Sequence, residues 1–416
     1  MAGYLSSLNP RLPRSVQALQ AGGLANAFGN GIVLPFTFIY LHNVRGISLG
    51  LAGLVLGTNA AVSLIAGPVS GTFVDRVGGK KTLAASLVFL AVGYAGYAFV
   101  QHPWQGFATA AITGIGNGAF WPAQSTLIAA LVPPEKRTPA FAMQRVVMNL
   151  GIGLGALTGG LIASTADPRS FQLLFLLDGL TFVVYLGVLW ALVPEPESHL
   201  RDHGESPPAG YTAVLRNRAF VGVIAINTVF IFAGFAGFDL LPVYAKNHAS
   251  VGERAIGIVF LVNTLVIVVL QLPVAKLTEG HRRMRTLALL GAVWALAWGL
   301  VPIAGIWLTG LAATALLALA VSVFGIGECL HGAVQAPLVA DLANPELLGR
   351  YMALSALSWQ VGFTLGPAAG GFAVAAAPHG TWLAAAAICG LNGIAALALE
   401  RRLPMRARRT PVAAVA

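Results

Sequence analysis

Long, predominantly apolar segments follow one another along almost the whole chain, and short polar segments separate them. The segments at 83–100 and 171–193 lack the strict apolar–polar alternation of a half-buried strand. A helix needs about 20 apolar residues to cross the hydrocarbon core of a bilayer, whereas a strand of a membrane barrel needs roughly 10 alternating ones. The pattern therefore predicts an all-α membrane protein, in which each span satisfies its own backbone hydrogen bonds.

Windows of about 20 residues predict twelve membrane-spanning helices. The longest polar segment, 194–218, contains four prolines and several charges and is predicted to be a cytoplasmic linker. It separates an N-terminal six-helix bundle at 1–193 from a C-terminal six-helix bundle with a basic tail at 219–416. The twelve predicted spans are 15–41, 49–73, 82–101, 106–131, 139–164, 171–193, 219–245, 253–277, 286–304, 309–340, 350–375 and 381–399.

The composition agrees with a membrane location. With 57% apolar residues, 10% charged residues and a mean hydropathy of +0.77 over 416 residues, the chain is too apolar for two or three soluble domains. Cys329 and Cys389 lie inside apolar segments, so we expect them to pack there rather than to form a disulfide framework. The first apolar segment, 15–41, is longer than the core of a typical signal peptide, and we expect it to be the first span.

The net charge of +10 is distributed unevenly. If both termini are cytoplasmic, 20 of the 25 Lys and Arg residues fall in cytoplasmic segments and four in external ones. This asymmetry predicts a multi-pass protein of the cytoplasmic (inner) membrane with both termini inside. The basic residues then face anionic membrane lipid, and nucleic acid is not expected as a partner.

The two halves of the chain are related by a shift of 211 residues. Between 114 and 160, 15 of 47 ungapped positions are identical under this shift. It superimposes 114–117 on 325–328, the Pro-Glu pair at 134–135 on 345–346, and the glycines of 155–160 on those of 366–371. Six spans separate equivalent positions, so we predict a parallel repeat about an axis along the membrane normal, as in alternating-access transporters.

A glycine-rich charged segment follows the second predicted span. Its sequence is Gly71-Thr-Phe-Val-Asp75-Arg76-Val-Gly78-Gly79-Lys80-Lys81. Gly71 is expected to allow the close approach of a neighbouring helix, and Gly78 to allow a tight turn. Asp75 and Arg76 are expected to make interhelical charged contacts that exist in only one conformation. We interpret the segment as a conformational latch, rather than only a topology signal, formed by Gly71, Asp75, Arg76, Gly78, Lys80 and Lys81.

This segment resembles the signature loop between helices 2 and 3 of the major facilitator superfamily. The departure is Gly79, where the family usually has a basic residue, and Lys80 is expected to serve instead. The resemblance extends over the chain through the span count, the repeat and the linker. It implies the major facilitator fold and secondary transport by alternating access. The corresponding segment of the second half, 273–283, lacks the Asp.

Glycines in spans five and eleven resemble the pattern Gly-x3-Gly-Pro-x2-Gly-Gly of the twelve-helix drug/proton antiporters in this superfamily. Span eleven has the complete pattern, whereas span five has Ala156 in place of the proline. Close helix packing alone also explains such faces. Ala110 departs from the antiporters, which usually have an arginine there. The predicted helix-packing residues are Gly151, Gly155, Gly159, Gly160, Gly362, Gly366, Pro367, Gly370 and Gly371.

The resemblance implies that helices 1, 4, 7 and 10 line a central cavity. Polar residues within spans are costly unless they face a cavity or a partner. The repeat places Asn117 on Glu328 and Gln124 on Gln335, which favours a cavity lining over interhelical hydrogen bonding alone. The substrate-cavity candidates are Asn26, Asn30, Asn117, Phe120, Trp121, Gln124, Phe235, Asp239, Glu328 and Gln335.

The proton-coupling candidates are Glu328, His331 and Asp239. Glu328 lies near the middle of span ten and shares a face with His331, so a proton could pass between them as the cavity changes sides. The alternative is a Glu328 that only fixes helix packing. Asp178 in span six and Arg145 in span five are predicted in opposite leaflets, so we do not pair them. We expect each to be a structural hydrogen-bond centre, and the alternative is that each is a proton site.

No catalytic residues, metal or cofactor are expected. The segment 78–82 lacks the glycine spacing of a phosphate-binding loop, and His199 and His203 lie in the linker. The predicted function is proton-coupled efflux of amphipathic or drug-like small molecules by a monomeric transporter that is not an enzyme. The alternatives are an importer, symporter or uniporter of a small solute such as a sugar or an organic acid, and a membrane sensor that transports nothing.

Overall fold

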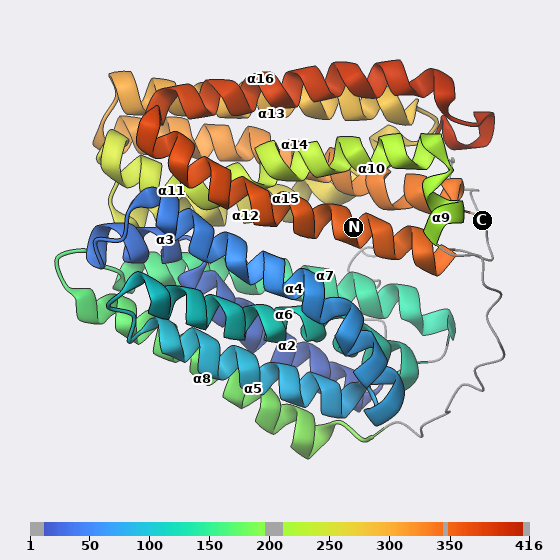
Figure 1. The fold of residues 1–416 in the computed structure, drawn as a ribbon, viewed down its shortest axis with the longest axis horizontal. Coiled ribbons are helices and arrows are strands. Elements are labelled where there is room, and N and C mark those ends of the chain that lie inside the picture. The colour runs from blue at the N-terminus through green and yellow to red at the C-terminus, as the bar shows by residue number, and fades with distance from the viewer. Residues whose placement is uncertain (1–11, 133, 196–210, 344–347, 411–416) are drawn as a thin grey trace. The chain divides into compact units, whose positions relative to one another are not determined.

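Nearly every residue that the structure describes lies in a helix (Figure 1). The structure is a computed structural model and describes residues 12–132, 134–195, 211–343 and 348–410. The chain divides into two units, Met1–Asp202 and His203–Ala416, and each is considered by itself. Most of the predicted linker, including His199 and His203, lies outside the described residues.

The N-terminal unit has a helix at each of its six predicted spans. The first span is broken after Val33, because Pro35 lacks the backbone N–H that would continue the helix. A second segment follows at an angle of 40°. The helices are α2 (Arg14–Val33), α3 (Thr37–Ile39) with the π-helix η1 (Tyr40–Val44), α4 (Leu49–Val77), α5 (Gly79–Tyr97), α6 (Pro103–Leu131), α7 (Pro134–Ile162) and α8 (Pro168–Leu192).

The C-terminal unit repeats this plan. Its first span is helical throughout. In the middle of this span a π-helical turn has hydrogen bonds between residues i and i+5, where an α-helix has them between i and i+4. The helices are α9 (Tyr211–Leu215), α10 (Arg218–Phe230), the π-helix η2 (Ile231–Phe235), α11 (Ala236–Ala249), α12 (Glu253–Thr278), α13 (Arg283–Trp307), α14 (Gly310–Leu342), α15 (Leu348–Ala376), α16 (Pro378–Leu399), and the 3-10 turns η4 (Glu400–Arg402) and η5 (Met405–Ala407).

The prediction of an all-helical membrane protein is confirmed. Within the described chain, eight helices are long and apolar enough to cross a membrane, and the bent first pair adds a ninth. The other three predicted spans coincide with α5, α6 and α15. The total of twelve stays a prediction for these three.

Helix pairing is the same in the two units. In the N-terminal unit α2 packs against α7 and α8, α4 against α6, and α5 against α6 and α8. In the C-terminal unit the span α10–η2–α11 packs against α15 and α16, α12 against α14, and α13 against α14 and α16. The sequence repeat therefore corresponds to a repeated packing arrangement.

The predicted packing glycines lie at the same contact in each unit. A Cβ on Gly155 would fall on the carbonyl oxygen of Phe28 in α2, and one on Gly366 would lie 3.0 Å from the carbonyl oxygen of Phe232 in η2. Backbones this close tolerate no side chain. Gly151, Gly159, Gly362 and Gly370 also face these first spans, and Gly160, Pro367 and Gly371 are buried.

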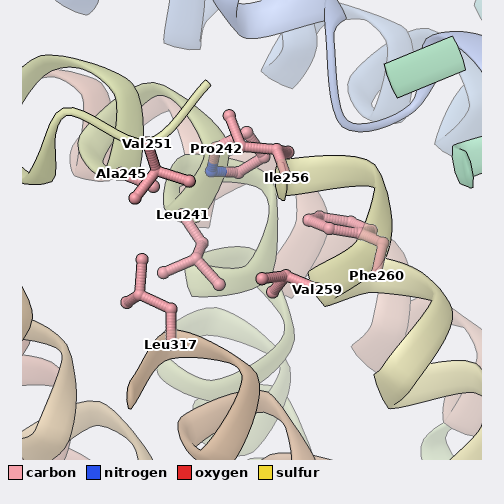
Figure 2. A pocket seen from close by; sticks show the side chains of 8 residues that line it. All are labelled: Leu241, Pro242, Ala245, Val251, Ile256, Val259, Phe260 and Leu317. Carbon is pink, nitrogen blue, oxygen red and sulfur yellow. The ribbon is translucent and has the colours of Figure 1, made fainter. Parts of the chain in front are cut away.

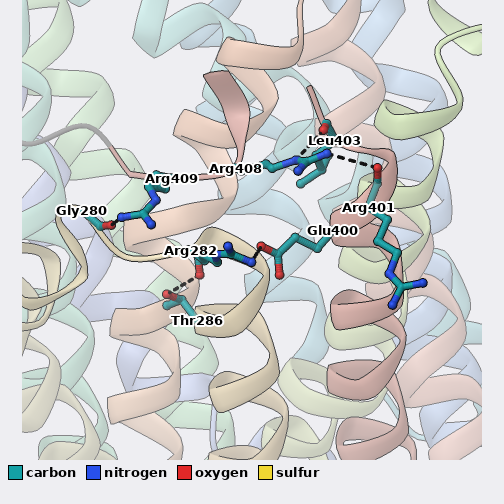
Figure 3. Close-up of polar contacts among 8 residues, drawn as sticks. All are labelled: Gly280, Arg282, Thr286, Glu400, Arg401, Leu403, Arg408 and Arg409. Carbon is teal, nitrogen blue, oxygen red and sulfur yellow. Dashed lines mark hydrogen bonds and ion pairs between the residues drawn. The ribbon is translucent and has the colours of Figure 1, made fainter. Parts of the chain in front are cut away.

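The C-terminal tail folds back onto the turn between α12 and α13. Arg283 is fully buried, and its Nη2 pairs with Asp341 Oδ2 of α14 at 2.6 Å. A backbone bridge joins Arg282 to Arg409. Figure 3 shows Arg282 paired with Glu400 at 3.0 Å and Arg409 bonded to the carbonyl oxygen of Gly280. These contacts tie the ends of four helices of this unit together.

Candidate functional site

The segment predicted as a latch comprises the end of α4, the turn at Gly78 and the start of α5. Gly78 ends α4 with a positive φ of 91°, which glycine adopts without strain. Lys80 is buried, and its Nζ donates to the carbonyl oxygen of Val193 at 2.6 Å and lies 4.9 Å from the centre of the Trp190 ring. Lys80 thus attaches the turn to the end of α8.

The other latch residues are less constrained. Lys81 pairs with Glu195 at 3.4 Å between two exposed side chains, and Arg76 is exposed. The close approach predicted at Gly71 is absent from this structure, because no described atom lies within 4 Å of the position of a Cβ there. The side chain of Asp75 lies outside the described residues, so its contact stays a prediction.

A polar contact joins α4 and α6 in the N-terminal unit. Asn117 is half-buried and donates from Nδ2 to Asn59 Oδ1 at 3.2 Å. Asn59 donates in turn to Thr113 Oγ1 at 2.6 Å. Gly114 allows this approach, since a Cβ there would lie 2.6 Å from the carbonyl oxygen of Asn59.

Gln124 lies apart from Asn117. It is only 3% exposed, donates to the hydroxyl of Tyr185 on α8 at 2.8 Å, and accepts a hydrogen bond from Gln144 on α7. In this conformation Gln124 is thus enclosed by α7 and α8, and its place in a substrate cavity stays a prediction. Although the two residues share a helical face, different helices cover that face at the two levels.

The remaining candidates of this unit differ in their surroundings. Phe120 belongs to the hydrophobic core, and its place in a substrate cavity stays a prediction. Trp121 is 46% exposed and packs edge-on to Phe120. Asn26 is buried with no hydrogen-bond partner for its Nδ2, and Asn30 is half-buried.

A second polar contact joins α12 and α14 in the C-terminal unit. Asn263 donates from Nδ2 to Glu328 Oε2 at 3.0 Å and to the carbonyl oxygen of Val321 at 3.1 Å. Glu328 is half-buried. Gly325 keeps the helices close, because a Cβ there would lie 3.0 Å from Asn263 Nδ2. An amide donor thus orients the carboxyl group.

The two contacts occupy equivalent places in the units. Asn59 is residue 11 of α4 and Asn263 is residue 11 of α12. Asn117 and Glu328 are matched by the shift of 211 residues. The N-terminal unit therefore has a neutral amide where the C-terminal unit has a titratable carboxyl group.

His331 is fixed by the first span of its unit. Its Nε2 lies 2.7 Å from Asn227 Oδ1 on α10, and Asn227 donates to Ser358 Oγ on α15 at 2.6 Å. Glu328, by contrast, bonds to α12. The shared face predicted for these two residues therefore contacts two different helices.

Aromatic rings surround His331. Trp294 stacks on it with ring centres 6.2 Å apart, and Phe235 and Trp359 meet it nearly edge-on at 5.7 and 5.3 Å. Phe235 also packs against Phe363. Phe235, Trp359 and Phe363 are only half-buried, so this cluster offers ring surface for an apolar ligand.

Gln335 is buried, and its Nε2 has no hydrogen-bond partner. The shift of 211 residues explains this difference from Gln124, because Ala396 and Ser355 replace the two partners that Gln124 has. A buried donor without a partner costs about 1–3 kcal/mol.

The pocket in Figure 2 lies between α11, α12 and α14. All eight residues that line it are apolar, so it offers no polar group that would orient a ligand. Asp239, half-buried on α11, does not line it. We regard the pocket as a packing gap. Its lining is Leu241, Pro242, Ala245, Val251, Ile256, Val259, Phe260 and Leu317.

Two residues of the polar contacts, Asn59 and Asn263, were not predicted as site residues. Each is the only asparagine in its predicted span. Both stand at the same place in equivalent spans, and this signal was available in the sequence. Arg145 is exposed on α7, whereas Asp178 is buried on α8. Within the described ranges, no cluster of three His, Cys, Asp or Glu residues forms a metal site.

A sequence model of the Major Facilitator Superfamily matches residues 21–304 and 240–414. The chain belongs to this superfamily. Multidrug resistance protein MdtH of Cronobacter sakazakii is 27% identical over 344 residues, which are 82% of each chain. The uncharacterized MFS-type transporter YqjV of Bacillus subtilis is 24% identical over 356 residues, 85% of this chain and 84% of that one.

Solved structures of transporters share the fold. The nucleoside transporter NupG, solved as a mutant, has a TM-score of 0.79 at 12% identity, covering 92% of this chain and 99% of its own. The peptide transporter POT in complex with sulfate has a TM-score of 0.77 at 16% identity, covering 95% and 96%. The predicted family and fold are confirmed, and this major facilitator protein is a multi-pass membrane transporter rather than an enzyme.

Proposed function

We propose that this major facilitator protein is a secondary active transporter that exports amphipathic or drug-like small molecules in exchange for protons. The observation that carries the proposal is Glu328, a half-buried carboxyl group inside a membrane span, oriented by Asn263. Ionisable groups in such places are costly and usually serve ion or substrate pathways. The equivalent Asn117 does not titrate, which supports proton binding at this contact in the C-terminal unit alone.

The aromatic cluster around His331 supports an amphipathic substrate. Half-buried rings at Phe235, Trp359 and Phe363 would contact apolar or aromatic parts of a ligand, and their faces would also attract a cation. The likeness to a protein named for multidrug resistance agrees with this substrate class.

Coupling would arise because a proton and a substrate compete for the site near Glu328. In alternating access the carboxyl group meets water on one side of the membrane and then on the other, so it takes up and releases a proton once per cycle. Inward proton flow would then drive outward substrate flow. The asymmetry of Lys and Arg supports placement in the cytoplasmic membrane with both termini inside.

The proposal is tested with purified protein in liposomes under an imposed pH difference. Ethidium and a neutral aromatic dye serve as probes, and empty liposomes and a protonophore serve as controls. We expect dye to move against its gradient while protons flow the other way, and we expect the protonophore to stop it. Movement of dye and protons in the same direction would establish a symporter, and no flux with any probe would favour a sensor.

A further inference from the structure

Asp178 on α8 is fully buried and has almost no compensation for a charge. Its side chain is 0% exposed. Oδ1 accepts one long hydrogen bond of 3.4 Å from Thr181 Oγ1, and Oδ2 has no hydrogen-bond partner. None of the ion pairs among the described residues includes Asp178. A buried, unpaired carboxylate costs several kcal/mol.

Among the residues whose side chains the structure describes, the helices packed against α8 supply no cation to Asp178. From α2, Gly29 faces it, because a Cβ there would lie 2.5 Å from Asp178 Oδ1. Asn26, one turn earlier, is neutral and leaves its own Nδ2 unpaired.

The other two neighbouring helices are equally neutral at this level. From α5 come the phenols Tyr94 and Tyr97, and Tyr94 stacks on Phe182 one turn beyond Asp178. α7 carries Arg145, which is exposed. On α8 itself, the hydroxyl of Tyr185 accepts a hydrogen bond from Gln124. A charge on Asp178 would therefore meet only neutral groups.

We propose that Asp178 is a second proton-binding site, in the N-terminal unit and separate from Glu328, and that its carboxyl group holds a proton in this conformation. The inference extends the proposed proton coupling but does not depend on Glu328. Only a proton is exchanged: the carboxylate takes one from water and later returns one to water.

The break in the first span provides a route for this exchange. Gly29, which closes the site from α2, lies one turn before Val33, where α2 ends ahead of the 40° bend at Pro35. A broken helix can move its halves separately. Movement of α2 about this break would lift Gly29 from Asp178 and admit water, and the return movement would trap the proton.

Infrared spectroscopy of the full chain in lipid tests the proposal directly. At neutral pH the wild type is expected to show C=O absorption of protonated carboxylic acids, and the difference spectrum between the wild type and Asp178→Asn should contain one such band. Glu328→Gln and Asp239→Asn are the matched controls and should retain this component. The proposal is overturned if the wild type shows no such absorption, or if the difference spectrum for Asp178→Asn contains no such band. Neither result affects the test of Glu328.

A second measurement uses the unaltered protein, in case Asp178→Asn does not fold. Dicyclohexylcarbodiimide attacks protonated carboxyl groups in apolar surroundings, and mass spectrometry locates the adduct. We expect Asp178 to be labelled, and labelling to become faster when an imposed pH difference drives the conformational cycle. Labelling of Glu328 or Asp239 without Asp178 under the same conditions contradicts the inference.

Discussion

The contact between the second and fourth spans is built in the same way in the two units but carries different chemistry. In the N-terminal unit an amide faces an amide, Asn59 and Asn117. In the C-terminal unit the amide Asn263 faces the carboxyl group of Glu328. Packing around both contacts is conserved between the units, with Gly114 and Gly325 in equivalent positions against the two asparagines.

This comparison shows which features the repeat keeps and which it has lost. The helix backbones approach each other closely in both units, because replacing a glycine at such a contact by a larger residue would separate the two helices. Side-chain chemistry is asymmetric, since a single residue can gain or lose a titratable group without changing the helix pairing. Gln124 and Gln335 differ in the same manner, one fully bonded and the other with an unpaired donor.

The largest effect is expected at the symmetric glycines. Gly155→Leu and Gly366→Leu would each push a side chain into the backbone of the first span of its unit, at a cost of about 3 kcal/mol. We expect both variants to lose most of the monodisperse protein in size-exclusion chromatography. Gly71→Leu, placed in open space, is the control and should remain folded. Normal yield from either packing variant would contradict the equivalence of the two contacts.

The next effect concerns the turns that follow the second span of each unit. Asp75→Asn should shift the balance between inward-open and outward-open states and reduce transport several-fold, because only the first turn has the predicted latch. Glu279→Gln, in the corresponding turn of the second unit, should leave the balance unchanged. Spin-label distances across the ends of the helices measure it. Equal shifts in the two variants would mean that both turns, or neither, act as latches.

A smaller effect is expected at the asparagines of the compared contacts. Asn263→Ala removes the donor that orients Glu328, so it should lower gradient-driven transport several-fold and move the pH at which transport is half-maximal. Asn59→Ala removes the oxygen that accepts the hydrogen bond of the neutral Asn117 amide, and should leave that pH unchanged. Rates measured from pH 5 to 9 decide between them. Identical pH profiles for the two variants would show that Asn263 does not act through Glu328.

The smallest effect is in stability. Gln335→Leu replaces an unpaired buried donor and should raise the free energy of unfolding by up to about 2 kcal/mol. Gln124→Leu breaks a satisfied pair and leaves Tyr185 and Gln144 without a partner, so it should lower the free energy of unfolding. Thermal unfolding in detergent gives the sign of each change. We expect the two changes in the free energy of unfolding to have opposite signs. Changes of the same sign would contradict the difference in hydrogen bonding between Gln124 and Gln335.

The long apolar segments and the sequence repeat predicted most of the fold. A continuous apolar segment of this length must form a helix in lipid, because only a helix satisfies its backbone hydrogen bonds within the segment. Three helices begin at Pro103, Pro168 and Pro378, each close to the predicted start of its span. Proline is favoured in the first turn of a helix, so these starts are visible in the sequence. The bend at Pro35 was not predicted, although the proline was visible. Hydropathy windows average over the few residues that decide such a break.

The site was predicted less well than the fold. A helical face identifies which residues point the same way, but it does not identify the helix that covers them at each level. Gln124 was therefore grouped with Asn117 although α7 and α8 bury it. The orienting role of Asn263 depends on a contact between two spans 65 residues apart, which no local pattern contains.

The central claim is that the carboxyl group of Glu328, and not its uncharged counterpart Asn117, couples transport to protons. The most direct measurement compares Glu328→Gln with Asn117→Gln in liposomes at a clamped pH difference. Glu328→Gln preserves shape and removes titration, so we expect it to abolish uphill dye transport while keeping dye binding and downhill exchange. Asn117→Gln should keep uphill transport and its dependence on the pH difference. Uphill transport by Glu328→Gln with the wild-type dependence on the pH difference would contradict the account.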